Sequence, residues 1–82
     1  MADDLYLLIH HAGVFDCSYR VMASETTIGR AESSALHLPD PAVSRAHAVI
    51  LRTNSGFLIR DLGSRNGIHF EGRPTNEVVL HE

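Results

Sequence analysis

Apolar and polar side chains alternate along most of this chain. The clearest stretch is residues 15–21, where every second side chain is apolar or aromatic. Because successive side chains of a β-strand point to opposite faces of a sheet, this period of two predicts a strand with one face on a core. The same pattern predicts eight short strands, at residues 5–9, 15–21, 26–28, 36–38, 47–52, 57–62, 68–70 and 78–80.

Turn-forming residues separate these strands. Glycine, asparagine and aspartate tolerate positive φ, and proline fixes φ, so clusters of them end regular structure. Such clusters are Ala12-Gly13, Pro39-Asp40-Pro41, Asn54-Ser55-Gly56, Gly63 to Gly67 and Glu71-Gly72. Short strands spaced in this way predict an all-β sandwich. Residues 31–35 have room for one helical turn at most.

Asn66-Gly67 carries a more specific prediction. An Asn-Gly pair between two apolar runs is typical of a tight hairpin turn, because both central residues of that turn need positive φ. We therefore expect a hairpin here. The asparagine side chain can donate and accept hydrogen bonds at once, and these are the two abilities needed to hold an extended peptide backbone.

The composition is that of one small globular domain. The chain has 82 residues, of which 44% are hydrophobic and 21% charged, so it can fold around a single core. Its net charge of −3 argues against a general nucleic-acid binder, which needs a surplus of basic side chains. The apolar run at residues 5–9 is too short for a signal sequence or a membrane span. We expect a cytoplasmic protein that binds neither nucleic acid nor a membrane.

Metal-dependent and thiol chemistry are not indicated. Cys17 is the only cysteine and lies within the alternating apolar pattern, so we expect a buried, inert thiol with no intramolecular disulfide. The six histidines show no spacing typical of a metal site. The sequence therefore predicts no cofactor, no metal and no enzymatic activity.

Ser44 and His47 need separate consideration as a catalytic pair. No acid stands at a matching position, and residues three apart along one predicted strand point to opposite faces. Ser44 either caps a turn or offers its hydroxyl to an anion. We interpret His47 as a buried histidine whose ring nitrogens bond nearby backbone. Gly29-Arg30 closes an apolar strand, where the arginine is either a solvated charge or a planar donor for phosphate.

Three motifs follow one another along the chain. Gly-Arg stands at 29–30, Val-Ser-Arg-x-His-Ala at 43–48 and Asp-Leu-Gly-Ser-x-Asn-Gly at 61–67. Each alone is weak, but together they resemble the forkhead-associated (FHA) domain over roughly residues 5–80. The resemblance implies an all-β fold of the FHA/SMAD-like class, a twisted antiparallel sandwich of two sheets. It also implies binding of phosphothreonine peptides through loops at one end.

The resemblance implies roles for individual residues as well. Arg30, Ser44 and Arg45 are expected to bind the phosphate. Asn66 and Arg65 are expected to bind the peptide, and Gly29, His47 and Gly67 to shape the loops. Arg65 stands in a loop associated with the third residue after the phosphothreonine, where an arginine favours an acidic residue. Ala35 departs from the pattern, since the family often has aspartate or asparagine there, and this puts the loop after Arg30 in doubt.

The family pattern continues past residue 82 with a turn and two strands, the last of which pairs with the first strand. On this interpretation residues 1–82 are a single domain without its C-terminal strands, and residues 5–9 form an unpaired sheet edge. Two explanations stay open: a fragment of a longer protein, or a chain that repairs the edge by homodimerising or exchanging strands. The expected partner is a phosphothreonine-containing protein, and the alternative function is a phosphate-independent interaction or dimerisation module.

Overall fold

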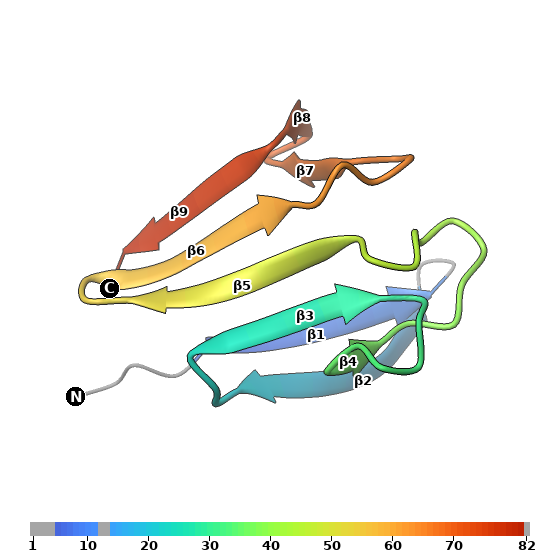
Figure 1. Ribbon diagram of the computed structural model, residues 1–82, viewed down its shortest axis with the longest axis horizontal. Helices are drawn as coiled ribbons and strands as arrows, with labels where there is room; N and C mark the ends of the chain where they lie inside the picture. The colour runs from blue at the N-terminus through green and yellow to red at the C-terminus, as the bar shows by residue number, and fades with distance from the viewer. Residues whose placement is uncertain (1–4, 12–13, 82) are drawn as a thin grey trace.

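In the residues that the computed structural model describes, all regular structure is β-strand. The structure describes residues 5–11 and 14–81. The strands in this part of the chain are β1 (Leu5–His11), β2 (Val14–Val21), β3 (Glu25–Gly29), β4 (Leu36–His37), β5 (Ala48–Thr53), β6 (Gly56–Asp61), β7 (Ile68–Phe70), β8 (Arg73–Thr75) and β9 (Glu77–His81) (Figure 1). Each of the eight strands expected from the alternation overlaps one of these. Across the same residues, no helix is long and apolar enough to cross a membrane.

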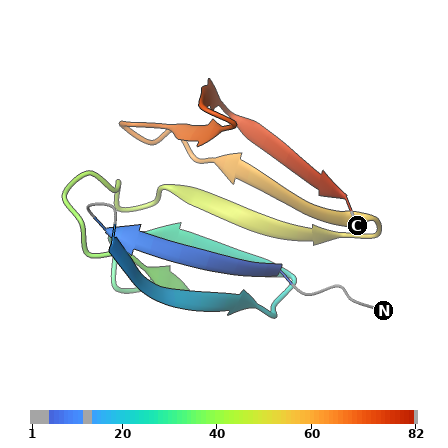
Figure 2. The ribbon, with the colours of Figure 1, turned by 180° about the vertical axis from the view of Figure 1, so that it is seen from behind.

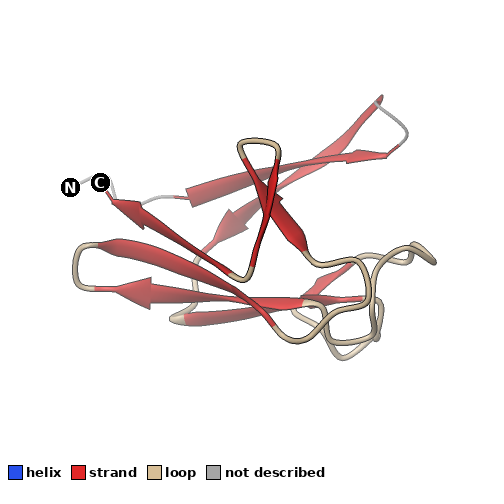
Figure 3. Ribbon diagram, turned by 90° about the horizontal axis from the view of Figure 1, so that it is seen from above, coloured by secondary structure: helices blue, strands red, loops and turns tan. Residues whose placement is uncertain are grey.

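The strands lie in two layers. One layer is a five-stranded sheet in the order β4-β3-β5-β6-β9, and the other consists of two separate hairpins, β1-β2 and β7-β8 (Figure 3). Seen from behind, β1 and β2 lie in front of β3 (Figure 2). The expected sandwich is thus confirmed, with one pairing that is not antiparallel: Ile28 and Leu36 pair in parallel where the two-residue strand β4 meets β3.

The core lies between the β1-β2 hairpin and the inner face of the five-stranded sheet. Its centre is Val21, Ile50 and Phe57. Half-buried apolar side chains packed around this centre are Leu5, Leu7, Tyr19, Ile28, Ile59 and Leu80. Full burial of a side chain such as valine, isoleucine or phenylalanine contributes about 1.5 to 3 kcal/mol, so these three residues are main contributors to stability.

The turn with two positive φ values lies elsewhere than expected. Glu71 and Gly72 have φ of 52° and 80°, and they join β7 to β8 with Phe70 paired to Arg73. Asn66 is not among the described residues with positive φ, and β6 pairs with β9 rather than with β7. The prediction of a hairpin at Asn66-Gly67 was therefore wrong, because this segment packs against another loop instead of closing two paired strands.

Among the strand boundaries that differ from the expectation, two bear on the site. β5 begins at Ala48 and β6 ends at Asp61, so His47 and Leu62 lie in loops. There the Leu62 N–H donates to the His47 carbonyl at 2.9 Å. This bond continues the β5-β6 ladder by one step between the two loops. Because His47 lies outside β5, the alternation of side chains along that strand does not fix the direction of its ring.

The β1-β2 hairpin corrects one prediction and leaves another untested. Cys17 is exposed, not buried as expected, because its pairing with Ile9 places it toward the turn of the hairpin, beyond the core centre. Within residues 5–11 and 14–81, β1 pairs with β2 alone. Homodimerisation through the other edge of β1 stays a prediction.

Candidate functional site

Three loops gather at one end of the five-stranded sheet. β3 ends, β5 begins and β6 ends at this edge, since Ile28 pairs with Ala48 and Ala48 with Asp61. The segments 30–35, 38–47 and 62–67 therefore emerge side by side (Figure 1). They contain every residue to which the sequence assigned a binding role. Loops held by a rigid sheet can place such side chains accurately.

The first two loops are joined by main-chain hydrogen bonds. The Arg30 N–H donates to the Ser44 carbonyl at 3.0 Å, and the Ala31 N–H donates to the Arg45 carbonyl at 3.2 Å. The Arg30 side chain adds a third bond, from Nε–H to the Val43 carbonyl at 3.0 Å. One of the five guanidinium donors is thereby used to fix the direction of the group, and the others are available at the surface.

Gly29 makes the close approach of these two loops possible. A Cβ at this position would lie 2.0 Å from the Arg45 carbonyl oxygen and 2.9 Å from the Ser34 hydroxyl. The resemblance implied a role for Gly29 in shaping the loops, but Gly29 is not among the described glycines with positive φ. What requires glycine here is the missing side chain rather than the backbone conformation.

His47 connects the second loop to the third. Its Nδ1 accepts the Ser44 N–H at 3.0 Å, and its Nε2 lies 2.8 Å from the Gly67 carbonyl. The first contact needs an unprotonated Nδ1 and the second a proton on Nε2, so the arrangement requires the neutral Nε2–H tautomer. Both ring nitrogens are thus engaged with backbone, and neither is available to take a proton from the Ser44 hydroxyl.

The position of His47 corrects the reason for which a catalytic pair was rejected. Ser44 and His47 do not lie along one strand, because both precede β5. The loop brings the imidazole to the Ser44 main chain instead of turning it to the opposite face. The absence of a base beside the hydroxyl follows from the hydrogen bonds of the ring, not from strand geometry.

Ser44 and Asn66 keep hydrogen-bonding groups that the bonds between the loops do not use. The Ser44 Oγ accepts the Arg65 N–H at 2.9 Å, and since a hydroxyl has one proton, that proton is left to donate to another group. The Asn66 Nδ2 donates one of its two protons to the Ala42 carbonyl at 2.7 Å, so its second N–H is left as a donor and its Oδ1 as an acceptor. The pair can therefore both donate to a ligand and accept from it.

Asp61 organises the third loop. Its carboxylate accepts the N–H groups of Gly63 and Ser64, each at 3.0 Å, and also the Ser64 hydroxyl proton. The Ser64 Oγ in turn accepts the Gly67 N–H at 2.9 Å. These bonds hold the turn that precedes Gly67. The Gly67 carbonyl is the group that accepts the hydrogen bond from the His47 Nε2.

The hydrogen bonds to Asp61 predict an acid-dependent stability. The Ser64 hydroxyl, with the backbone N–H groups of Ser64 and Gly63, lowers the pKa of Asp61 below its ordinary value of 3.8. The unfolded chain therefore binds the proton on Asp61 more tightly than the native chain does. The ionised Asp61 carboxylate contributes to the free energy of unfolding above its ordinary pKa, and this contribution is lost as pH falls through the pKa of the native state. We expect Asp61→Asn to reduce the dependence of the melting temperature on pH below about pH 4. Plots of melting temperature against pH that stay parallel for the two proteins down to about pH 2 would contradict this.

The structure brings most of the predicted site residues into one network. The members joined by the hydrogen bonds above are Gly29, Arg30, Ser44, Arg45, His47, Asn66 and Gly67, of which Gly29 contributes through its lack of a side chain. Arg65 joins only through its N–H. Its guanidinium has no partner within the described residues, so it is exposed and able to contact a ligand.

No metal centre is formed in the part of the chain that the structure describes. There, no group of three or more histidine, cysteine, aspartate or glutamate side chains is placed to hold a metal ion.

Comparison with known families shows to which family a chain with these three joined loops belongs. The family model for the FHA domain matches residues 26–82, more than half of the chain. The chain belongs to the FHA domain family. The resemblance found in the three motifs is thereby confirmed, and the motifs all fall within the matched residues.

This FHA domain is similar to parts of longer proteins. It is 42% identical over 61 residues to the transcriptional regulatory protein EmbR of Mycobacterium tuberculosis, which covers 74% of this chain and 16% of EmbR. It is also 42% identical over 55 residues to the oxoglutarate dehydrogenase inhibitor of Corynebacterium diphtheriae, which covers 67% of this chain and 38% of the inhibitor. The FHA domain thus spans less than half the length of either relative.

Solved FHA structures match the fold closely. A structure from a study of phosphothreonine-dependent FHA domain interactions has a TM-score of 0.76 at 31% identity, covering 92% of this chain and 75% of that one. Mycobacterium tuberculosis EmbR in complex with a low-affinity phosphopeptide has a TM-score of 0.73 at 37% identity, covering 80% of this chain and 18% of that one. A match over 92% of the chain extends into β1 and β2, which precede the residues matched by the family model.

Sequence reasoning assigned no role to several contributors to the FHA loop network. They include Ala31, Ala42, Val43, Asp61 and Ser64. The spacing Asp-x-Gly-Ser is a signal that identifies the Asp61 turn, because aspartate often bonds backbone N–H groups a few residues further on. No side-chain signal exists for Ala42, which takes part through its main chain, with its carbonyl accepting from Asn66 and its N–H donating to the Asp40 carboxylate.

Proposed function

We propose that this FHA domain binds phosphothreonine-containing peptides and so mediates phosphorylation-dependent interactions with partner proteins. The observation that carries the proposal is the placement of Arg30 beside Ser44, held together by the main-chain bond between them at 3.0 Å. Because this bond holds the main chains of Arg30 and Ser44 together, the proposal has their guanidinium and hydroxyl, from different loops, bind the same phosphate. The related structures support the choice of ligand, since one was studied for phosphothreonine-dependent interactions and another contains a phosphopeptide.

The physical chemistry of phosphate fits this pair of donors. A phosphothreonine carries about −1.5 to −2 charges at pH 7 and three acceptor oxygens. Charge-assisted bonds from arginine to phosphate are about twice as strong as neutral ones, so two or three such bonds discriminate strongly against an unmodified threonine. The net charge of −3 does not oppose binding, because the acceptor is met locally by arginines on the loops.

The proposal assigns Arg30 and Ser44 to the phosphate and the Asn66 amide to the peptide main chain. Arg45, which the resemblance places at the phosphate, and Arg65, which it places at the peptide, are secondary ligand contacts, while Gly29, His47 and Gly67 hold the loops. No step in this scheme breaks a covalent bond. The domain is proposed to act as an interaction module in the cytoplasm, not as an enzyme.

Asn66 provides a direct test of peptide main-chain binding. Asn66→Ala is expected to weaken binding by about 1 kcal/mol per hydrogen bond lost, because both the tether to Ala42 and the outward acceptor disappear. Asn66→Asp is expected to be worse, since it adds an anion beside a phosphopeptide. Calorimetry with one phosphothreonine peptide measures both. An aspartate variant that binds as well as the unmodified domain would contradict the assignment.

The function itself is tested with peptide libraries. Fluorescence polarisation against degenerate phosphothreonine, phosphoserine and unphosphorylated libraries is expected to show binding to the phosphothreonine library alone. Equal binding to phosphorylated and unphosphorylated libraries would instead establish the alternative, a phosphate-independent interaction module. Circular dichroism on the same sample controls for folding.

A further inference from the structure

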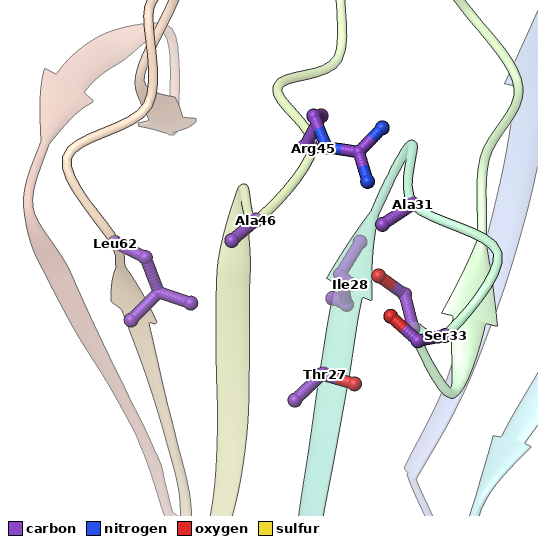
Figure 4. Close-up of a pocket in the computed structure, with 8 residues that line it drawn as sticks. Thr27, Ile28, Ala31, Ser33, Arg45, Ala46 and Leu62 are labelled. Carbon is purple, nitrogen blue, oxygen red and sulfur yellow. The ribbon is translucent and has the colours of Figure 1, made fainter.

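A pocket opens immediately beside the proposed phosphate site. It has a volume of about 300 Å³, at the lower end of the range for ligand pockets. Ile28, Ala46 and Leu62 form an apolar side, and Ser33, Ser34 and Arg45 provide the polar groups. Figure 4 shows Leu62 and Ala46 on one side, Ser33 on the other and the Arg45 side chain above.

The polar groups of this pocket have no partners within the described residues. No hydrogen bond or ion pair is formed there by the Arg45 guanidinium or by the hydroxyls of Ser33 and Ser34. One cationic group and two hydroxyl donors thus converge on a space that no acidic side chain lines. Such a set of donors is suited to an anionic group.

The pocket is one residue away from each proposed phosphate donor. Ala31, which follows Arg30, and Arg45, which follows Ser44, both line it. The Ala31 N–H donates to the Arg45 carbonyl at 3.2 Å, one residue along from the bond between Arg30 and Ser44. A peptide whose phosphate is bound by Arg30 and Ser44 can therefore place a nearby side chain in this pocket.

We infer that this pocket is a specificity subsite for a glutamate side chain close to the phosphothreonine in the same peptide. The inference rests on the proposed function. The methylenes of the glutamate pack on Ile28, Ala46 and Leu62, and its carboxylate accepts hydrogen bonds from Arg45 and the two serine hydroxyls. Arg45 thus reads a carboxylate next to the phosphate rather than serving as a third phosphate ligand.

The lining favours glutamate over the other charged side chains. A lysine or arginine is repelled by Arg45 and leaves the hydroxyl protons unused. A second phosphate group is too thoroughly polar for the side formed by Ile28 and Leu62, since its oxygens all need hydrogen-bond donors. Aspartate carries the same charge but lacks the length to pack on the apolar side while reaching the guanidinium.

The test is a comparison of peptides that differ only at one position. A phosphothreonine peptide with glutamine at each flanking position in turn is compared with its glutamate counterpart by calorimetry. At one position the glutamate peptide is expected to bind about five- to tenfold more tightly, the range between an exposed ion pair and a hydrogen-bonded one. In Arg45→Gln this ratio is expected to fall to about one, and in the double variant Ser33→Ala, Ser34→Ala to fall in part, whatever happens to the overall affinity.

Arg65→Gln is measured in parallel, because Arg65 is itself assigned to the peptide. Arg60→Gln is the matched control, because its arginine pairs with Glu77 outside the three loops and outside this pocket. The same glutamate preference is expected to survive in that variant. A preference that is absent at every position, or that is unchanged by Arg45→Gln, or that is lost with Arg65→Gln instead, overturns the inference while phosphothreonine binding stands. If no phosphothreonine peptide binds, the proposed function has failed and the subsite fails with it.

Discussion

Replacing Arg30 with alanine is expected to weaken phosphothreonine-peptide binding by about 2 to 5 kcal/mol, the cost of removing one partner from a desolvated charge pair. The effect is large because the Nε bond to the Val43 carbonyl already fixes the guanidinium in place, so little side-chain entropy is lost on binding. Calorimetry gives the affinity. Thermal unfolding is expected to change little, since the Val43 bond is exposed and contributes about 1 kcal/mol.

Two control variants make the Arg30 experiment specific. Arg30→Lys keeps the charge but loses the planar fork of donors, so it is expected to bind more tightly than Arg30→Ala and less tightly than the unmodified domain. Arg60→Ala removes another half-exposed arginine, one that pairs with Glu77 at 2.8 Å outside the three loops. Its affinity is expected to equal that of the unmodified domain. Equal affinities for Arg30→Ala and Arg60→Ala would remove Arg30 from the phosphate site.

Gly29→Ala is expected to lower both the stability of the domain and its affinity for the peptide. The added methyl would lie 2.0 Å from the Arg45 carbonyl oxygen, and backbone on both sides must shift to relieve the overlap. Overpacking of this kind costs about 1 to 3 kcal/mol and occasionally more. The shift also separates Arg30 from Ser44, so the two phosphate donors no longer meet one ligand. Urea unfolding measures the first effect and calorimetry the second.

Gly72→Ala is the matched control for that experiment. Gly72 has φ of 80°, and an added Cβ meets no atom within 4 Å. The substitution is expected to cost about 1 to 2 kcal/mol for the left-handed backbone, with no change in affinity, since Gly72 lies in the β7-β8 turn, outside the three loops. If Gly29→Ala loses stability but binds as Gly72→Ala does, the close approach of the loops is not what positions the phosphate donors.

The strands were predictable from sequence because each depends on a local pattern. Alternation located eight of the nine described strands, but β8 was missed, since it has only three residues and contains Pro74, which normally marks an edge or a break. Asn66-Gly67 misled for a related reason. Its turn signal is real, but tertiary contacts of Asn66 with Ala42 and of Gly67 with His47 override it. Cys17 was wrongly expected to be buried for a similar reason. Alternation predicts which face of a strand a side chain lies on, but not how far along the strand the core extends.

The residues of the candidate site were predictable as types, but their contacts were not. A motif places Ser44 and His47 in one loop, yet only the folded chain shows that the imidazole bonds the Ser44 main chain and the Gly67 carbonyl. These bonds span up to 20 positions along the chain. They depend on the register of β5 against β6, which aligns Ala48 with Asp61 and which no local pattern encodes. The pocket beside Arg45 was missed for the same reason, since its lining comes from three loops and one strand.

The bonds that join the three loops end almost entirely on main-chain atoms. The carbonyls that accept them are those of Ala42, Val43, Ser44, Arg45, His47 and Gly67. The side chains at 31, 42, 43 and 65 make none of these bonds. Those four positions are therefore open to substitution without rebuilding the frame that holds the ligand. In evolutionary terms the domain separates what it recognises from how it stays folded, so a lineage can acquire a new target by changing the residues at the tips of its loops.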